Sequence, residues 1–210
     1  MKNMRLFTLL LCGTIPIIMF GSPQLKGSAQ DRSISAFRLN GTPIEVDGRL
    51  DDPVWQELPR QGDFLQRNPD DGSKATQRTE FAVAYNSEFL YVGIRAFDDQ
   101  PELIDGILTR RDESSPSDWL YISIDSYHDH RTAFEFGLNA AGVKQDLRRF
   151  DDDNADFDWN AVWEGDVNID DQGWTAEFAI PFRELRFNSA ESLNWGLNVY
   201  REFPRNDNEL

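Results

Sequence analysis

The chain has 210 residues, of which 37 are acidic and 21 basic, so its formal net charge at neutral pH is −16. A protein with this charge repels the phosphates of nucleic acids and of anionic bilayers, which makes both poor partners. The one cysteine of the sequence, Cys12, lies in the N-terminal segment that we expect to be cleaved off, so the mature protein would have neither a disulfide nor a thiolate metal site.

The first 29 residues have the pattern of a secretory signal peptide. Lys2 and Arg5 precede an apolar run over residues 6–20, and the segment ends in the small residues 27–29. The run is shorter than the roughly 20 residues that a membrane-spanning helix needs. We therefore expect export to the periplasm, the outer membrane or the cell surface, with a lead-in over residues 30–41 before the folded domain.

A short helix is predicted over residues 51–58, "DDPVWQEL". Asp52 is typical of an N-cap, and Pro53 suits the first helical position. The aspartates of "VDGRLDDPVW" could surround a cation, but Asp47-Gly48 is typical of a turn and Trp55 of a core anchor. The structural interpretation is therefore preferred for this segment.

From residue 79 the sequence alternates apolar and polar residues with the two-residue period of β-strands. Residues 79–97 predict a hairpin that turns at Asn86-Ser87. Further strands are predicted over residues 118–125, 131–138, 174–180 and 195–201, with turns at 139–142, 170–173 and 188–192 and a second short helix at 181–185. Many short strands separated by turns predict an all-β, antiparallel β-sandwich of the jelly-roll type, with one or two short helices.

The most acidic stretch is "DDDNADFDWNAVWEG", residues 151–165. Clustered carboxylates repel one another unless water or a cation neutralises them. Calcium prefers hard oxygen ligands of this kind. The candidate ligands of a structural calcium ion are Asp151, Asp153, Asp156 and Asp158. The stretch lacks the glycine and the terminal glutamate of an EF-hand, so a solvated loop stays the alternative.

Two further groups could carry chemistry. His128 and His130 in "YHDHR" could face one side of a strand toward zinc, but no third ligand is evident. Glu135, Asp158 and Glu164 lie beside aromatic residues, as the acid of a glycosidase would. No nucleophile motif such as G-x-S-x-G accompanies them. We therefore expect no catalysis within this domain.

Aromatic rings are what a saccharide-binding surface needs, because the C–H patches of a pyranose stack on indole and phenol rings. Trp119 and Tyr121 point away from the apolar face of the predicted strand at 118–125. Trp159 and Trp163 lie in and just after the acidic loop. Packing inside the sandwich is the alternative for all four, and it is favoured for Trp163.

The sequence resembles the carbohydrate-binding module family 9-like domain over residues 42–205. The resemblance rests on the segments "IEVDGRLDDPVWQEL", "RTEFAVAYNSEFLYVGIRAFDD", "SDWLYISIDSYHDHRTAFEFGLNAAGVKQD", "WNAVWEG" and "GWTAEFAIPFRELRF". Similar domains stand at the N-terminus of bacterial cell-surface proteins, ahead of a predicted outer-membrane β-barrel. The resemblance implies a β-sandwich that binds saccharide, and a chain that continues past residues 206–210. Calcium sites in similar modules are usually structural.

The resemblance carries only part of the family's sugar site onto this chain. Where sugar-binding members have a glutamate, this chain has Tyr121, and where they have an arginine and an asparagine it has Gly137 and Asn139. Their stacking tryptophan ahead of the strand is replaced by Pro116 and Ser117. The candidate saccharide-binding residues are Trp119, Tyr121, Asn139 and Trp159.

We therefore expect a secreted, non-catalytic module that binds extracellular saccharide, as the N-terminal part of a larger cell-surface protein for polysaccharide binding or catabolism. The alternative is an accessory domain that docks on its own C-terminal β-barrel or on a protein partner. An exposed row of Trp119, Tyr121 and Trp159 would favour saccharide. Burial of the same residues against a continuing chain would favour docking.

Overall fold

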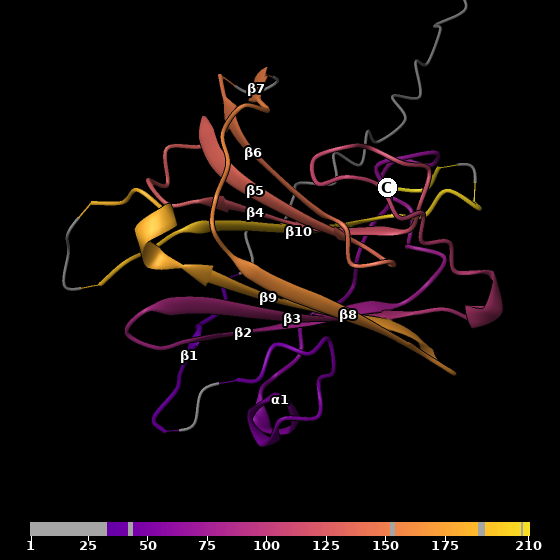
Figure 1. Cartoon of the computed structure of the whole chain (residues 1–210), viewed down its shortest axis with the longest axis horizontal. Helices are drawn as coiled ribbons and strands as arrows, with labels where there is room; N and C mark the ends of the chain where they lie inside the picture. The colour runs from indigo at the N-terminus through magenta and orange to yellow at the C-terminus, as the bar shows by residue number, and fades with distance from the viewer. Residues whose placement is uncertain (1–32, 42–43, 152–153, 189–191, 207) are drawn as a thin grey trace, which may run out of the picture. The chain divides into compact units, whose positions relative to one another are not determined.

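The computed structural model describes residues 33–41, 44–151, 154–188, 192–206 and 208–210, in which two β-sheets face each other (Figure 1). The predicted signal peptide lies outside the described residues, and so do Asp153 and most of the predicted turn at 188–192. Within the described residues the helices are α1 (Pro53–Glu57) and two short 3-10 turns, η1 (Pro101–Leu103) and η2 (Phe182–Glu184). None of them is long and apolar enough to cross a membrane. The predicted all-β sandwich is confirmed.

The first sheet has the strand order β1-β2-β3-β9-β8. Its strands are β1 (Phe37–Arg38), β2 (Thr79–Tyr85), β3 (Phe89–Phe97), β9 (Gly173–Pro181) and β8 (Glu164–Asp170). β2 and β3 form the predicted hairpin, with Val83 opposite Val92, and β3 then places Val92 opposite Phe178 of β9. The pairing of β1 with β2 is parallel, whereas the other pairings of this sheet are antiparallel.

The second sheet has the strand order β10-β4-β5-β6-β7 and is antiparallel throughout. Its strands are β10 (Gly196–Glu202), β4 (Trp119–Asp125), β5 (Thr132–Asn139), β6 (Lys144–Phe150) and β7 (Asn154–Asp156). β4 lies between β10 and β5, so that Ser123 faces Asn198 on one side and Glu135 on the other. This register decides which side chains share the outer face of the sheet.

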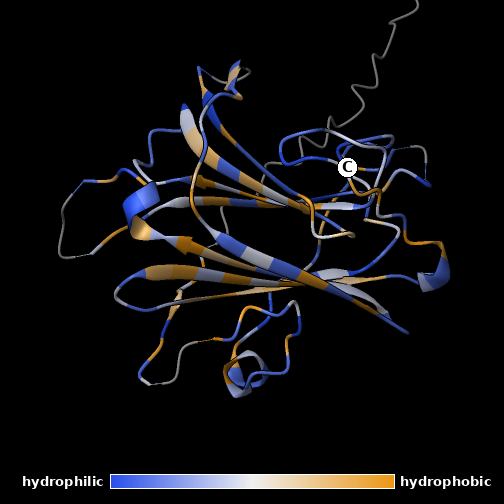
Figure 2. Ribbon diagram, viewed as in Figure 1, coloured by the Kyte–Doolittle hydropathy of each residue, from blue (hydrophilic) through white to orange (hydrophobic). Residues whose placement is uncertain are grey.

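The inner faces of the two sheets form one apolar core. Hydrophobic and hydrophilic residues alternate along the strands in Figure 2, as the two-residue period requires. Leu120, Ile122 and Ile124 of β4 pack in this core. Trp163 stacks on Phe178 of β9, with ring centroids 5.8 Å apart and an interplanar angle of 7°. The prediction that Trp163 is a core residue is confirmed, since its side chain is buried.

Strands β6 and β8 were not predicted, because their sequences "KQDLRRF" and "EGDVNID" are rich in charge. In β6 the cost of burying Asp146 is offset by its hydrogen bonds. Its carboxylate accepts from the backbone N–H of Ala161 at 2.6 Å and from Trp163 Nε1 at 3.2 Å. β8 is an edge strand, where one side of the ladder needs no partner. Polar composition is therefore compatible with both strands.

The N-terminal segment 44–58 covers the outer face of the first sheet. Ile44, Leu50 and Trp55 of this segment pack with small and aromatic residues of β2, β3 and β9. Trp55 is 1% exposed, which confirms its prediction as a core anchor. The helix begins at Pro53 as predicted, but Asp52 makes no side-chain capping bond; its Oδ2 instead accepts a hydrogen bond from the backbone N–H of Glu45.

Glu177 of β9 fastens this segment to the sheet. Its Oε1 accepts a hydrogen bond from Trp55 Nε1 at 2.7 Å. Its Oε2 accepts from the backbone N–H groups of Asp47 at 3.0 Å and Gly48 at 2.9 Å. Burial raises the pKa of Glu177 to about 7, against the opposing effect of these three hydrogen bonds.

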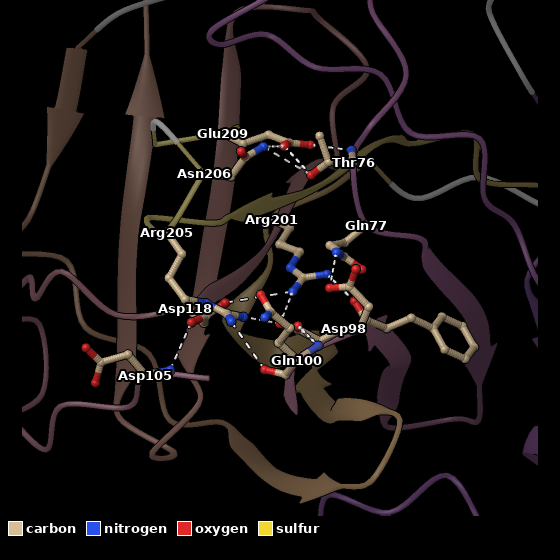
Figure 3. A network of polar contacts seen from close by, with 12 residues as sticks. Thr76, Gln77, Asp98, Gln100, Asp105, Asp118, Arg201, Arg205, Asn206 and Glu209 are labelled. Carbon is tan, nitrogen blue, oxygen red and sulfur yellow. Dashed lines mark hydrogen bonds and ion pairs between the residues drawn. The ribbon is translucent and has the colours of Figure 1, made fainter. Parts of the chain in front are cut away.

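A cluster of buried charges ties the C-terminal segment to the loops at one end of the sandwich (Figure 3). Arg201 donates to the carbonyl of Phe97 at 2.8 Å, and its Nη2 lies 3.5 Å from Asp98 and 3.8 Å from Asp118. Arg205 also pairs with Asp98. Removal of one partner would leave an uncompensated buried charge, so the cluster acts as a unit.

The raised pKa of Glu177 predicts that the domain is more stable in mild acid than in mild base. The folded state holds this proton more tightly than the unfolded chain, whose carboxyl has the ordinary pKa of 4.5. The resulting stabilisation is full below about pH 4.5 and is lost as the pH rises through about 7. Thermal melts across this range measure it. Glu177→Gln should flatten the dependence, whereas the exposed Glu164→Gln should not; equal slopes in both variants would contradict the prediction.

Candidate functional site

The outer face of the second sheet carries a stack of three aromatic rings. Trp119 and Tyr121 lie on this face because the alternate residues of β4 point into the core. Their ring centroids are 5.4 Å apart, and Tyr200 of β10 continues the stack at 4.8 Å from Tyr121. The absence of a side chain at Gly137 makes room for the stack, because a Cβ there would lie 2.4 Å from the Tyr121 ring.

A charged and hydroxyl-bearing cluster adjoins the stack. Arg149 of β6 donates two hydrogen bonds of 2.7 Å to the two carboxylate oxygens of Glu135 on β5. This bidentate pairing raises the pKa of the Arg149 guanidinium, so the guanidinium stays charged. Burial raises the pKa of the Tyr200 hydroxyl, and the neighbouring Glu135 adds to the shift, so this hydroxyl stays protonated. Burial and the Glu135 charge also raise the pKa of Glu202.

A groove of about 570 Å³ runs along β10 beside this cluster. Ser123, Glu135 and Arg149 contribute to its lining from the neighbouring strands, and residues 64–67 also line it. Asn198 of β10 is exposed in the groove. Its side-chain amide has no hydrogen bond to the part of the chain that the structure describes. The groove therefore offers a guanidinium, an amide, hydroxyls and a carboxylate to a ligand.

Trp119 and Tyr121 lie on the predicted face, but they are buried there. Trp119 is 1% exposed, and its Nε1 donates to the carbonyl of Ser115 in the preceding loop. Tyr121 is 6% exposed, and its hydroxyl donates to Gln145 Oε1 at 3.1 Å. The chain's own loops and neighbouring side chains cover these two rings. The rings are therefore not open to stack on a sugar.

Asn139 is also enclosed by the fold. Its Nδ2 donates to the carbonyl of Ile107 at 2.8 Å, and its Oδ1 accepts from the backbone N–H groups of Ala141 and Val143. The side chain is fully buried and holds the turn that follows β5. This geometry argues against the predicted saccharide contact, because both ends of the amide are occupied within the protein.

Trp159 lies on the other side of the second sheet from Trp119 and Tyr121. Its ring contacts Phe134 and Phe136, whose side chains belong to the core. The three aromatic residues therefore do not form one row. Trp159 closes the core near the acidic loop and is half-buried there.

The acidic loop neutralises part of its charge with arginines. Asp151 pairs with Arg131 at 2.7 Å, and Asp156 pairs with Arg148 at 2.9 Å. Asp158 is exposed, and Asp153 lies outside the described residues. Among the residues that the structure describes, no three acidic, histidine or cysteine side chains converge as metal ligands.

The candidate zinc ligands and two of the candidate catalytic carboxylates do not line the groove, and the third carboxylate, Glu135, lines it as the partner of an arginine. His128 and His130 lie in an exposed turn with their ring centroids 4.7 Å apart. Asp158 and Glu164 are exposed, which denies them the apolar pocket that a catalytic acid needs. Glu135 does line the groove, but it is held by Arg149. Glu135 therefore positions the guanidinium of Arg149.

Sequence reasoning missed the groove residues Arg149, Asn198, Tyr200 and Glu202. The signal was present in the polar positions of "WGLNVYR", since Asn198 and Tyr200 alternate with the core residues Leu197 and Val199. Arg149 carried no such signal, because the strand that contains it was not predicted.

The sequence matches no family model and no curated protein. A family 9 carbohydrate-binding module from Caldicellulosiruptor kristjanssonii, solved with glucose, aligns over 79% of this chain and 78% of its own, with 15% identity and a TM-score of 0.55. The fold is that of a family 9 carbohydrate-binding module.

Two further structures align with this chain. The Caldicellulosiruptor module in complex with cellotriose aligns over 80% of this chain and 76% of its own, with 15% identity and a TM-score of 0.55. A proposed carbohydrate-binding protein from Bacteroides uniformis aligns over 84% of this chain and 86% of its own, with 10% identity and a TM-score of 0.63. The family 9 fold therefore extends over most of the described chain.

The presence of calcium in the 151–158 loop stays a prediction, and thermal melts with and without a chelator test it. A bound ion would stabilise only the folded state, so chelation would lower the melting temperature. An unchanged melting temperature would leave the solvated loop as the answer, with Arg131 and Arg148 as the partners of Asp151 and Asp156. A lower melting temperature with chelator that Asp156→Asn abolishes would instead assign an ion to this loop.

Proposed function

We propose that the domain binds saccharide without catalysis, in the groove over the outer face of the second sheet. The observation that carries the proposal is the lining of this groove of about 570 Å³, where Arg149 is held by buried Glu135 beside Tyr200 and Asn198. Saccharide hydroxyls need both donors and acceptors in fixed positions. The family 9 fold, shared with modules solved with glucose and cellotriose, supports this ligand class.

The ion pair gives the groove a rigid donor. Glu135 is 4% exposed and Arg149 38%, so the carboxylate lies beneath the guanidinium. Two of the five guanidinium N–H donors serve Glu135, and the others are available to neighbours and to a ligand. Because the guanidinium is already oriented, a hydroxyl that binds it pays less ordering entropy.

Absence of catalysis is part of the same proposal. Glycoside hydrolysis needs two carboxylates across the scissile bond, one acting as acid and the other as nucleophile or base. Glu135 has the charge for the second role, but its bidentate partner Arg149 covers it. Glu202 has a raised pKa, yet it lies on β10, with β4 between it and β5. The arrangement favours binding over cleavage.

Asn198→Ala tests the groove directly. Since the side-chain amide of Asn198 has no hydrogen bond to the described chain, its removal should leave the melting temperature unchanged. It should weaken saccharide binding by about 0.5–1.5 kcal/mol, the net worth of one hydrogen bond. Calorimetric titration against a panel of neutral mono- and oligosaccharides measures the change.

Two controls separate the groove from other surfaces. Asn154→Ala removes an exposed amide on β7, away from the groove, and should leave binding unchanged. Trp159→Ala should affect stability but not the groove contacts, since this ring packs on Phe134 and Phe136. If the wild-type protein binds no saccharide of the panel, the proposal fails, and docking on another protein segment becomes the better account of the fold.

We also propose that the protein is exported, as the N-terminal part of a larger cell-surface protein. The charged start, the apolar run at 6–20 and the small residues at 27–29 support cleavage after Ala29. Mass spectrometry of the exported protein should therefore find Gln30 as its first residue. A membrane-bound form that retains Met1 would refute export by a cleaved signal.

A further inference from the structure

A second hollow of about 390 Å³ adjoins the groove. Ser123, Arg149 and Asn198 line both, so the two hollows meet at these side chains. From there the second hollow runs toward the turn between β4 and β5, where His130 and Thr132 line it. The outer face of the second sheet thus has two adjoining compartments that share one set of polar groups.

The length of this surface exceeds that of a single sugar ring. Tyr200 lines the groove and Gly196 the second hollow, at positions four residues apart on β10. At the rise of an antiparallel strand this corresponds to about 13 Å. A ligand that reaches from one compartment to the other must therefore contain more than one pyranose ring.

The two arginines of this surface that lie on or beside the second sheet are already paired with carboxylates of the protein. Arg149 is committed to Glu135, and Arg131, at the far end, is paired with Asp151. Glu202 adds a carboxylate to the groove and Asp125 adds one to the second hollow. An anionic sugar would meet these carboxylates with no uncommitted guanidinium among the residues just named, and the net charge of −16 would repel it further.

One cation at the rim does not change this balance. Arg67 also lines the groove, but it is exposed to solvent. Water and salt screen an exposed charge, so it contributes little to the binding of an anion.

We propose that the ligand is an uncharged oligosaccharide that lies across both compartments, with one residue beside Tyr200 and a later residue beside His130. This inference rests on the proposed function and adds to it the charge class and the minimum length of the ligand. Arg149 and Asn198, at the junction, contact the part of the ligand that joins the two ends.

Titration calorimetry with oligosaccharides of graded length tests the inference. The probes are gluco-, xylo- and manno-oligosaccharides of one to five residues, together with oligogalacturonates of the same lengths. We expect the affinity for a neutral series to rise at least tenfold between the monosaccharide and the trisaccharide. We expect the oligogalacturonates to bind at least tenfold more weakly than neutral chains of equal length.

A pair of histidine variants assigns the second compartment. His130→Asn removes a ring that lines the hollow, and asparagine tolerates the positive φ of 56° at this position. His128→Asn is the matched control, since His128 has a φ of 52° in the same turn but does not line the hollow. His130→Asn should weaken trisaccharide binding several-fold and leave the monosaccharide unchanged, whereas His128→Asn should change neither.

The outcomes separate this inference from the function on which it rests. Equal affinity for the monosaccharide and the trisaccharide, with His130→Asn silent, would overturn the second compartment while saccharide binding stands. Tighter binding of the oligogalacturonates than of the neutral chains would overturn the charge class. Binding of neither series would refute the proposed function and this inference together.

Discussion

Side chains of a β-strand point alternately to its two faces, and β4 shows how much of this fold depends on that alternation. Leu120, Ile122 and Ile124 enter the core between the sheets. The residues between them, Trp119 and Tyr121, reach the outer face with Ser123. A shift of the strand by one residue would exchange the two sets, placing polar atoms in the core and apolar ones outside. Core and groove are therefore two sides of one register.

Rings and charges on the outer face depend on each other. The stacked rings of Trp119, Tyr121 and Tyr200 form an apolar layer on this face, and the layer shields the neighbouring side chains from water. In that environment a lone carboxylate would be costly, which is why Glu135 is found with the bidentate partner Arg149. The same pairing holds the guanidinium at the groove. The ion pair of Glu135 and Arg149 thus both neutralises a buried charge and orients a donor of the groove.

Buried polar groups also hold the outlying segments to the sandwich. Glu177 binds the turn and the helix of the N-terminal segment through three hydrogen bonds on the outer face of the first sheet. Arg201 and Arg205 meet Asp98 at the end of the sandwich, beside the C-terminal segment (Figure 3). Neither residues 44–58 nor the described residues after β10 form a strand of either sheet. Hydrogen bonds and ion pairs of buried side chains supply the directed contacts that strand pairing supplies elsewhere.

The sequence by itself determined the sandwich, because the two-residue period of 79–97, 118–125 and 174–180 is a local property of the chain. It also determined that Trp55 and Trp163 are core residues and that Trp119 and Tyr121 turn away from the core face. The charged strand β6 escaped prediction, because its polar side chains are satisfied by partners distant in sequence, such as Trp163 for Asp146. Only the tertiary structure decided the site, since Glu135, Arg149 and Asn198 stand on three different strands. Their proximity depends on the order and register of the strands, and the apolar period of a single strand contains no information on either.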